Sequence, residues 1–445
     1  MKRIIISKLL GQILGIKFIP LNPFLTAFIL SLTARPYYKK SFLFNKRRKK
    51  LFFIPKTLFL PDLINTFHED DKELELWYIS SEAIRQIANR YLPKELSEYN
   101  YNSNSDDINK RKIELKNHWI KSIKIFKFIF RPKAFLTCAF YYRDQRELGI
   151  ASLENKIPFI ALHKECIASP ITREARLKVY KENSGKYTGT LITTQNKEEK
   201  DTLVNAGCAL DSQVEVVGCP RFDPIINNSL DLSLINSYDV IFFYFTEFAY
   251  LPFYRDKPIW PEKVGSIPVN PWTWKKLHER FNNFVFQFTE SNPSLNIALK
   301  IKHGESLAKQ FIEKQMPSNL TIISTGEGRE MAAKAKVISA FNTTTILEGL
   351  AARTPVIVPA FGEAALGSIL QEIGTLNLGN AVSYASSESD FNRLILDKLK
   401  IKNDRYRDFN ESEKVALNRY VGYNDGKSGR RVRNLVNKTI NSYSK

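Results

Sequence analysis

The sequence predicts an α/β protein with two domains, each built on a parallel sheet wrapped by helices. Short apolar segments of the kind found in buried strands alternate with segments of helical periodicity along most of the chain. This alternation pauses near residue 220 and then resumes. A chain of 445 residues with 43% hydrophobic content is also long enough for two or three domains with substantial cores. We therefore expect an N-terminal domain over residues 37–233, a C-terminal domain over residues 234–410 and closing helices over residues 411–445.

The net charge and the cysteines limit which partners and which cellular compartment the sequence indicates. Lysine and arginine number 66 against 46 aspartates and glutamates, which gives a formal net charge of +20. Such an excess indicates an anionic partner: nucleic acid, an acidic membrane surface or a phosphorylated substrate. The four cysteines have no CxxC spacing, so we expect reduced core thiols in a cytoplasmic protein, not a zinc site or disulfides. A nucleic-acid-binding protein ranks low, because the sequence has no recognised binding motif and no interleaved basic and aromatic stripe.

Residues 1–36 differ from the rest of the chain. Apolar residues recur at helical spacing between Ile6 and Leu14 among basic residues, and a second apolar patch runs from Phe24 to Leu32. Neither part has the roughly 20 apolar residues that a membrane-spanning helix needs, and no signal-peptide cleavage site follows. We expect an amphipathic segment that lies on an anionic membrane surface, aided by the basic run of residues 46–50. Two alternatives stay open: a merely solvated charge run, and packing of the apolar residues on the N-terminal domain as ordinary core.

The first domain has a regular rhythm of strands and helices. The expected strands are residues 51–54, 74–79, 134–139, 158–162, 190–193 and 214–217. The helical segments between them are residues 82–91, 113–130, 143–155, 173–182 and 197–206. The polar residues 99–107 are expected to form a surface loop.

We expect the first domain to end in the turn GCPRFD, residues 218–223, directly after the last of these strands. Arg221 offers a bidentate donor for a phosphate or a carboxylate, and Asp223 can fix that arginine or cap the following segment. A plain interdomain turn explains the same residues equally well.

The second domain repeats the alternation. The expected strands are residues 239–245, 296–301, 337–341 and 355–358, and the helices are residues 272–288, 346–352, 366–373 and 389–399. Open parallel sheets carry their ligands at strand ends. Lys300, Lys302 and His303 end one strand and could neutralise a diphosphate or phosphodiester, with His303 donating to a leaving phosphate. A solvated strand terminus is the alternative.

The βαβ unit of residues 337–359 contains the richest group of candidates. The helix start holds Asn342, Thr343, Thr344 and Thr345. Unpaired backbone N–H groups and the helix dipole favour an anion at such a position, so a phosphate could bind there. Glu348 lies one turn further and is suited to hydrogen-bond ribose hydroxyls. Asparagine and threonine are also ordinary helix caps, which is the simpler explanation.

Residues 342–357, NTTTILEGLAARTPVI, resemble the segment S/N-S/T-T-x-x-x-E-A-x-x-x-G-x-P-V in the C-terminal half of GT-B glycosyltransferases. In that family the segment holds the phosphate and ribose of a nucleotide-sugar donor. This chain differs by having Gly349 in place of alanine and Arg353 in place of glycine. The resemblance implies the GT-B fold, with two Rossmann-like domains whose parallel sheets face a central cleft and a C-terminal helix that crosses back.

Three shorter segments add to the resemblance. Residues 218–223 are similar to the G-x-P-R-x-D of surface-carbohydrate glycosyltransferases and teichoic-acid glycerophosphotransferases, and Kdo transferases have a related G-N-x-K-F-D. Residues 300–304 resemble the K-x-H-P element of bacterial sialyltransferases and capsule transferases, with Gly304 in place of proline. Residues 421–432 resemble the closing D-G-x-A/S-x-R-V of surface-carbohydrate transferases.

In enzymes of this family a base for the acceptor hydroxyl comes from the N-terminal domain. The best candidate in this sequence is the charged cluster of residues 163–165, at the end of the strand of residues 158–162. Glu165 is expected to act as the base, because an apolar strand end can raise a carboxyl pKa, and His163 is the competing choice. Structural roles for both stay open. No Asp-x-Asp element occurs near a strand end, so we expect neither a metal nor another cofactor.

The sequence thus leads us to expect a glycosyltransferase at the cytoplasmic face of the membrane, acting in the assembly of a capsule, lipopolysaccharide or other surface polysaccharide. The nucleotide-sugar donor would bind the C-terminal domain, and a glycan or lipid-linked glycan acceptor would bind the N-terminal one. A CMP-linked ulosonic acid is the favoured donor and a UDP-sugar stays open. The alternatives are a CDP-glycerol-type polyol-phosphate transferase and a sugar-nucleotide 2-epimerase, the latter disfavoured because it needs several catalytic carboxylates.

Overall fold

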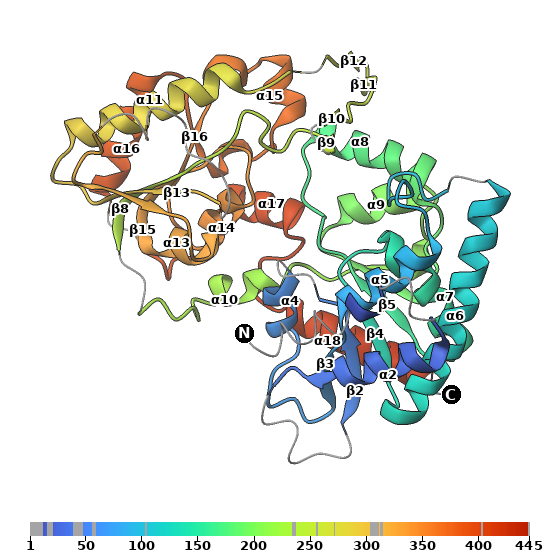
Figure 1. Ribbon diagram of the computed structural model, residues 1–445. Coiled ribbons are helices and arrows are strands. Elements are labelled where there is room, and N and C mark those ends of the chain that lie inside the picture. The colour runs from blue at the N-terminus through green and yellow to red at the C-terminus, as the bar shows by residue number, and fades with distance from the viewer. Residues whose placement is uncertain are drawn as a thin grey trace. The chain divides into compact units, whose positions relative to one another are not determined.

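The computed structural model describes residues 12–15, 21–38, 48–55, 59–102, 105–233, 237–254, 257–270, 272–302, 311, 315–401 and 404–443 (Figure 1). The chain forms two compact units. One consists of Met1–Cys166, Leu177–Arg221 and Lys427–Lys445, and the other of Ile167–Arg176 and Phe222–Gly426. The central segment of the first unit thus ends inside the turn of residues 218–223, and the C-terminal segment of the chain, with its last helix, belongs to the first unit again.

The described part of the first unit contains a seven-stranded sheet in the order β1-β3-β2-β4-β5-β6-β7. Its strands are β1 Arg35–Pro36, β2 Lys49–Phe53, β3 Leu74–Tyr78, β4 Ala134–Thr137, β5 Phe159–Leu162, β6 Leu191–Thr194 and β7 Val214–Val216. All neighbouring strands are parallel except β1 and β3. The six predicted strands of this domain are therefore confirmed, and β1 is an edge strand that the sequence did not predict.

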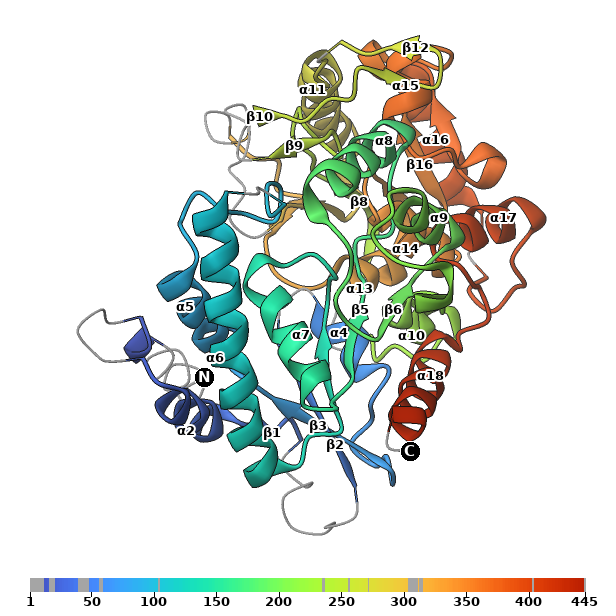
Figure 2. The same cartoon turned by 90° about the vertical axis from the view of Figure 1, so that its right-hand side faces the viewer.

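Helices cover both faces of this sheet (Figure 2). They are α2 Pro23–Thr33, α4 Leu60–Ile64, α5 Ser81–Tyr91, α6 Asp106–Phe130, α7 Arg146–Glu154, α9 Lys197–Asn205 and α18 Ser428–Tyr443. Each face of the sheet carries its own hydrophobic core. Successive side chains of β2 point to opposite faces, as in any strand, and so enter different cores. Phe52 packs in the core with Phe126 of α6, whereas Leu51 and Phe53 pack in the core that contains Val436 of α18. The last helix therefore covers one face of the first sheet.

One predicted boundary was wrong. Helix α6 begins at Asp106, seven residues before the predicted start at residue 113, so the end of the expected loop 99–107 is helical. The reason is a capped start: the hydroxyl of Ser105 accepts a hydrogen bond from the backbone N–H of Ile108 at 3.3 Å. Asp106 and Asp107 then occupy the first turn, where carboxylates interact favourably with the helix dipole.

The described part of residues 1–36 joins the first unit. Asn22 caps α2 by accepting a hydrogen bond from the backbone N–H of Leu25 at 2.8 Å. Helix α2 packs on α6, and Thr26 Oγ1 lies 2.8 Å from His118 Nε2. Leu30 is fully buried in the core shared with α6. No helix in the described ranges is both long and apolar enough to span a bilayer. Residues 1–11, which include the predicted apolar positions 6, 9 and 10, lie outside the described residues.

Two lysines of the basic run 46–50 make contacts with other residues of the same unit. Lys49 and Lys50 begin β2, and the Lys49 ammonium donates hydrogen bonds to Asn437 at 2.7 Å and Asn441 at 2.8 Å. The Lys50 ammonium lies 4.6 Å from the centre of the Trp77 ring. These two charges therefore help to fix α18 and Trp77 on the sheet, where a cation over an aromatic ring is stabilising.

The second unit, in its described residues, contains a six-stranded sheet in the order β14-β13-β8-β15-β16-β17, with all neighbours parallel. Its strands are β8 Tyr238–Phe243, β13 Ile297–Lys300, β14 Leu320–Ile323, β15 Ala335–Ser339, β16 Val356–Pro359 and β17 Ser383–Ala385. Two antiparallel pairs accompany it, formed by β9 Phe253–Tyr254 with β10 Lys257–Pro258 and by β11 Lys263–Val264 with β12 Ile267–Pro268. The four predicted strands are confirmed, and β14 and β17 were missed.

Helices also cover both faces of the second sheet (Figure 1). Helices α11 Lys275–Ser291 and α16 Glu388–Lys400 lie on one face, and α13 Gly328–Lys334 and α14 Thr345–Ala351 lie on the other. Phe242 of β8 packs against α11, and Phe391 of α16 stacks on Phe284 of α11 with ring centroids 4.3 Å apart. The other α-helices within the described residues are α8 Pro170–Val179, α10 Asp223–Ile226, α15 Ile369–Gly374 and α17 Glu411–Tyr420.

Candidate functional site

The candidate donor site lies at the carboxyl edge of the second sheet. Strands β13 and β15 are the two neighbours of β8, and all three run in the same direction. The residues that follow β13 and β15 therefore reach the same edge. At a strand spacing of about 4.8 Å, the two strand ends are about 10 Å apart.

Asn342 holds the loop between β15 and α14. Its backbone has a positive φ of 45°, and its side chain is buried. The side-chain amide donates hydrogen bonds to the carbonyl of Gly374 at 2.7 Å and to that of Ala249 at 3.1 Å. The amide group of this predicted phosphate ligand is thus engaged in fixing the loop.

The three threonines after Asn342 differ in what their hydroxyls do. Thr343 Oγ1 accepts a hydrogen bond from the backbone N–H of Thr345 at 3.4 Å, which is a local turn contact. Thr344 is the N-cap residue of α14, yet its side chain makes no capping hydrogen bond. Both side chains are partly exposed, whereas Thr345 is buried. Helix capping, the simpler explanation offered by the sequence, therefore does not account for the hydroxyl of Thr344.

Glu348 lies one turn into α14 and is half-buried. A Cβ atom built on Gly328 would come within 2.7 Å of Glu348 Oε2 and 3.1 Å of Thr345 Oγ1. The backbone at the start of α13 therefore approaches this carboxylate closely, and a side chain at position 328 would require the Glu348 carboxylate to shift. This contact was not predicted, although Gly326 and Gly328 follow β14 closely and could have indicated it.

The lysines after β13 have different surroundings. Lys300 is buried, and its ammonium donates a hydrogen bond to the carbonyl of Ile301 at 2.9 Å. Lys302 is exposed. The predicted proton donor His303 lies outside the described residues, so its assignment stays a prediction.

A further polar group at this edge was given no role by the sequence analysis. Tyr244 follows β8 directly, and its hydroxyl lies 3.1 Å from His278 Nε2 on α11. The side-chain amide of Asn282 also lies 2.9 Å from the same nitrogen. Burial lowers the pKa of His278, so this histidine is neutral at pH 7. His278 and Asn282 are one turn apart on α11, whereas Tyr244 follows β8, and no spacing in the sequence could have joined the tyrosine to them.

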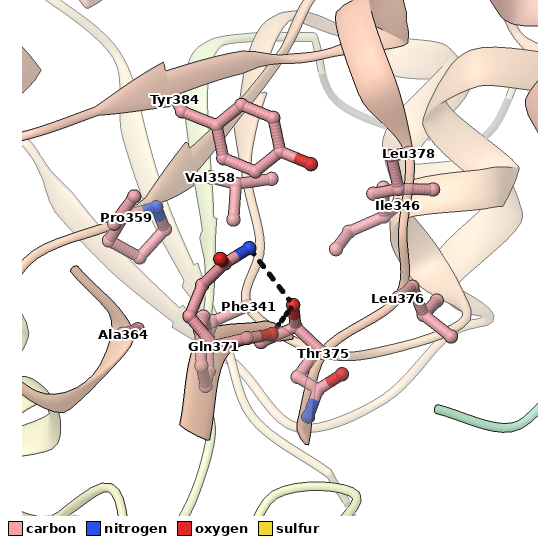
Figure 3. Close-up of a pocket in the computed structure, with 12 residues that line it drawn as sticks. Phe341, Ile346, Val358, Pro359, Ala364, Gln371, Thr375, Leu376, Leu378 and Tyr384 are labelled. Atoms are coloured by element: carbon pink, nitrogen blue, oxygen red, sulfur yellow. Dashed lines mark hydrogen bonds between the residues drawn. The ribbon is translucent and has the colours of Figure 1, made fainter. Parts of the chain in front are cut away.

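A small cavity near α14 is too tight for a substrate (Figure 3). Its walls are mainly apolar and include Ile346, Val358 and Tyr384. Gln371 and Thr375 face each other across part of it, with the glutamine amide 3.4 Å from the threonine hydroxyl. The cavity volume is about 10 Å³. A single water molecule needs about 10–15 Å³, so this space is a packing defect and not a nucleotide pocket.

The predicted residues of the first domain all lie in the first unit. The backbone N–H of Arg221 donates a hydrogen bond to Asp62 Oδ1 at 3.1 Å, and the arginine is half-buried. Glu165 Oε1 lies 3.2 Å from the ammonium of Lys164, and the Glu165 side chain is 45% exposed. His163 is instead fully buried, with Nε2 3.1 Å from Glu199 Oε1. Of the two candidate bases, His163 is buried from solvent, whereas the side chain of Glu165 is close to half exposed.

Comparison with known proteins gives the fold. No protein-family model and no curated protein sequence matches the chain. A crystal structure assigned as a UDP-N-acetylglucosamine 2-epimerase from Listeria monocytogenes is similar over 89% of this chain and 97% of that one, with 12% identity and a TM-score of 0.51. The UDP-GlcNAc 2-epimerase from Neisseria meningitidis covers 88% and 100% at 12% identity and a TM-score of 0.46. The wall teichoic acid polymerase TagF, as its H548A variant, covers 100% and 98% at 9% identity and a TM-score of 0.46.

The likeness to the Listeria structure, together with the two parallel sheets, shows the fold. This chain has the GT-B fold. At 12% identity the comparison shows the fold alone.

Proposed function

We propose that this chain is a nucleotide-sugar-dependent glycosyltransferase whose donor nucleotide binds at the carboxyl edge of the second sheet. The start of α14 supports the proposal most directly. The hydroxyl of Thr344 is not used for capping, and the carboxylate of Glu348 lies one turn away against the backbone of Gly328. A hydroxyl placed for a phosphate and a carboxylate placed for ribose hydroxyls fit a nucleotide.

The donor that we favour is a CMP-linked ulosonic acid, with a UDP-sugar as the second choice. The reason is the pairing, in the sequence, of the hydroxyl-rich helix start with the element that contains Lys300, Lys302 and His303. Lys300 and Lys302 lie at the same sheet edge as that helix start. In this scheme the exposed ammonium of Lys302 attracts the donor phosphate, and His303 protonates the leaving phosphate. Arg221 is proposed as a further hydrogen-bond donor to the phosphate of the nucleotide sugar. The reaction is proposed to need no metal, so EDTA should leave turnover unchanged.

The acceptor, a glycan or lipid-linked glycan, is proposed to bind the first unit. A base must then take the proton of its attacking hydroxyl. Glu165 and His163 both remain candidates, and the burial of His163 against Glu199 favours the histidine.

We also propose that the first unit docks on an anionic membrane, at the inner face of the cell membrane. Helix α2 contains no charged residue, and one of its faces packs on the protein. Its other face exposes Phe24, Phe28 and Leu32, at 69%, 51% and 54% of their surface. A spacing of four residues places these side chains in one stripe on the helix. An uncovered apolar stripe of this kind is typical of a helix that lies in a membrane interface.

Helix α6, on which α2 packs, adds apolar and basic groups. Phe128 and Ile129 in its last turn are 87% and 52% exposed. Lys121 and Lys124, one to two turns earlier, are exposed as well. The combination provides apolar anchors together with charges that attract anionic headgroups, each worth about 1 kcal/mol near the surface.

Two other functions of the same fold stay as candidates. One is a sugar-nucleotide 2-epimerase, because the Listeria structure with this fold is assigned to that activity. The other is a CDP-glycerol-type polyol-phosphate transferase. An epimerase converts its nucleotide sugar with no acceptor present, whereas both transferases release the nucleotide only when an acceptor is added.

The nucleotide site is tested by saturation-transfer NMR and thermal shift against CMP, CDP, UDP and GDP. We expect Thr344→Ala and Glu348→Ala each to weaken nucleotide affinity without unfolding the protein. A hydrogen bond to a charged group is worth about 1.5–3 kcal/mol, which is roughly ten- to hundredfold in affinity. The controls are Thr321→Ala and Glu372→Ala, two exposed positions of the same unit. Unchanged affinity in both site variants, or binding of none of the four nucleotides by the wild type, would refute the proposal.

A further inference from the structure

His163 is held by a chain of hydrogen bonds that begins 36 residues further along the sequence. Glu199 Oε1 lies 3.1 Å from His163 Nε2 and also accepts a hydrogen bond from the Tyr180 hydroxyl at 3.2 Å. All three side chains are buried. Asn196 caps α9 by accepting from the backbone N–H of Glu199 at 2.9 Å, so the carboxylate stands in the first turn of that helix. A carboxylate there is favoured by the helix dipole and by its two hydrogen-bond donors.

This arrangement fixes the tautomer of His163. An ionised carboxylate can only accept, so the proton of the neutral imidazole must be on Nε2. Nδ1 then carries a lone pair. It is buried and has no hydrogen-bond partner among the residues that the structure describes. The imidazole is thus oriented with its basic nitrogen unused by the protein.

Two more buried acceptors stand next to His163 at the same sheet edge. Thr194 ends β6 and Gln195 follows it, and both are at most 3% exposed. Thr194 Oγ1 and Gln195 Oε1 also have no partner among the described residues. All three residues line one cavity of about 20 Å³. That is room for about one oxygen-sized group, which must bring a proton to donate.

We propose that Glu199 and Tyr180 are positioning residues that hold His163 as a base, with its Nδ1 aimed at an acceptor hydroxyl seated by Thr194 and Gln195. This inference rests on the proposed glycosyltransferase function. The hydroxyl proton moves to His163 Nδ1 while its oxygen forms a bond to the anomeric carbon of the donor sugar. The bond from that carbon to the nucleotide phosphate breaks, and the phosphate leaves with the electron pair. The carboxylate of Glu199 compensates the positive charge that forms on the imidazole.

The tautomer is measured directly on the full chain labelled with 15N-histidine. The sequence has five histidines, and His163→Gln identifies the signal of this one. Two-bond proton–nitrogen correlations show which ring nitrogen carries the proton. We expect a neutral imidazole protonated at Nε2 in the wild type and a mixture of tautomers in Glu199→Leu. Asp201→Asn, an exposed change in the same helix, should keep the wild-type pattern.

Turnover separates positioning from folding. We expect Glu199→Leu to lower kcat about 10- to 100-fold, a part of the 10²–10⁴-fold that a general base contributes, while KM changes less than about twofold. Glu199→Gln should fall between this variant and the wild type, since its amide oxygen still accepts from Nε2 but carries no charge. If Glu199→Leu does not fold, the kinetic test uses two other variants. The isosteric Glu199→Gln and Tyr180→Phe are then expected to lower kcat by less than Glu199→Leu would.

Two results would overturn the inference: a wild-type His163 protonated at Nδ1, or a kcat for both Glu199 variants equal to that of Asp201→Asn. Failure of the proposed function is a distinct result. A chain that binds no nucleotide refutes that function, yet the tautomer is read without substrate. A proton on Nε2 then still supports the assigned geometry, and a proton on Nδ1 still overturns it.

Discussion

Replacing Arg353 tests how the C-terminal end of α14 is held. Its backbone has φ of 58°, in the left-handed region, where a non-glycine residue costs about 1–2 kcal/mol. Its buried guanidinium donates hydrogen bonds to the carbonyl of Arg407 at 2.7 Å, of Ala351 at 3.2 Å and of Ile226 at 3.3 Å. It also lies 4.0 Å from the centre of the Phe409 ring. These contacts offset the backbone strain.

The expected magnitudes follow from these contacts. The short hydrogen bond is worth about 1.5 kcal/mol, and the two longer ones and the cation–π contact about 1 kcal/mol each, which totals about 4 to 5 kcal/mol. Arg353→Ala should lose that amount and keep the strained φ. Arg353→Gly should lose the same contacts but relieve the strain, so it should be about 1 kcal/mol more stable than the alanine variant. In a helix interior the order is the reverse, with glycine the less stable residue.

Hydrogen exchange is the suitable assay, because a chain of two units need not unfold in one step. The reporters are the backbone N–H groups of Ala352, Arg353 and Thr354, which bond to carbonyls of α14 at 3.0, 2.9 and 3.0 Å. Arg393→Ala, a surface arginine of α16 at 63% exposure, should change their protection by less than about 0.5 kcal/mol. Protection in Arg353→Gly that is equal to or lower than in Arg353→Ala would refute the strain argument.

Three further predictions concern the two units separately. His303→Ala should lower turnover more than it weakens nucleotide binding, since its proposed work is on the leaving phosphate, and a pure binding defect would count against this role. Replacing Phe24, Phe28 and Leu32 together by serine should release the chain from anionic liposomes at low salt in a sedimentation assay, with high salt releasing the wild type too. Equal binding of the wild type to neutral and anionic liposomes would contradict the electrostatic part. Burial lowers the pKa of His118 from 6.5 to about 4, so its contribution to stability is complete above about pH 6.5 and is lost as the pH falls toward 4. The loss amounts to about 3 kcal/mol, and the thermal midpoint of His118→Gln should therefore fall less between pH 7 and pH 4 than that of the wild type.

The strands that the sequence predicted are those with fully buried, continuous apolar runs. Strands β5 and β16 are buried at every position and could be recognised from composition alone. Strands β14 and β17 were missed because most of their residues are partly exposed and only one position in each is fully buried. The start of α6 could have been predicted, since a serine followed by two aspartates is a common helix start.

The candidate site was predictable only where its members are close in sequence. The α14 group lies within seven residues, and its spacing alone suggested a phosphate and a ribose. His163 and Glu199 are 36 residues apart, and the sequence could not show that they meet. His163 and Glu165 also show that a position just after a strand does not by itself tell which of two residues is the better candidate base. Glu165, two residues later, is nearly half exposed beside Lys164, and that difference in environment appears only in the fold.

The two departures from the GT-B motif concern how α14 is packed. A Cβ atom at Gly349 would lie 2.4 Å from Ile338 Cδ1 and 2.8 Å from Val356 Cγ2. Both neighbours are buried and β-branched, so they occupy the space that the alanine of the motif would need. Arg353 fixes the far end of the same helix through buried carbonyls. The residues proposed to meet the nucleotide, Thr344 and Glu348, are partly exposed and keep the motif. The substitutions therefore alter how α14 is held on the sheet and leave its proposed nucleotide-binding residues in place.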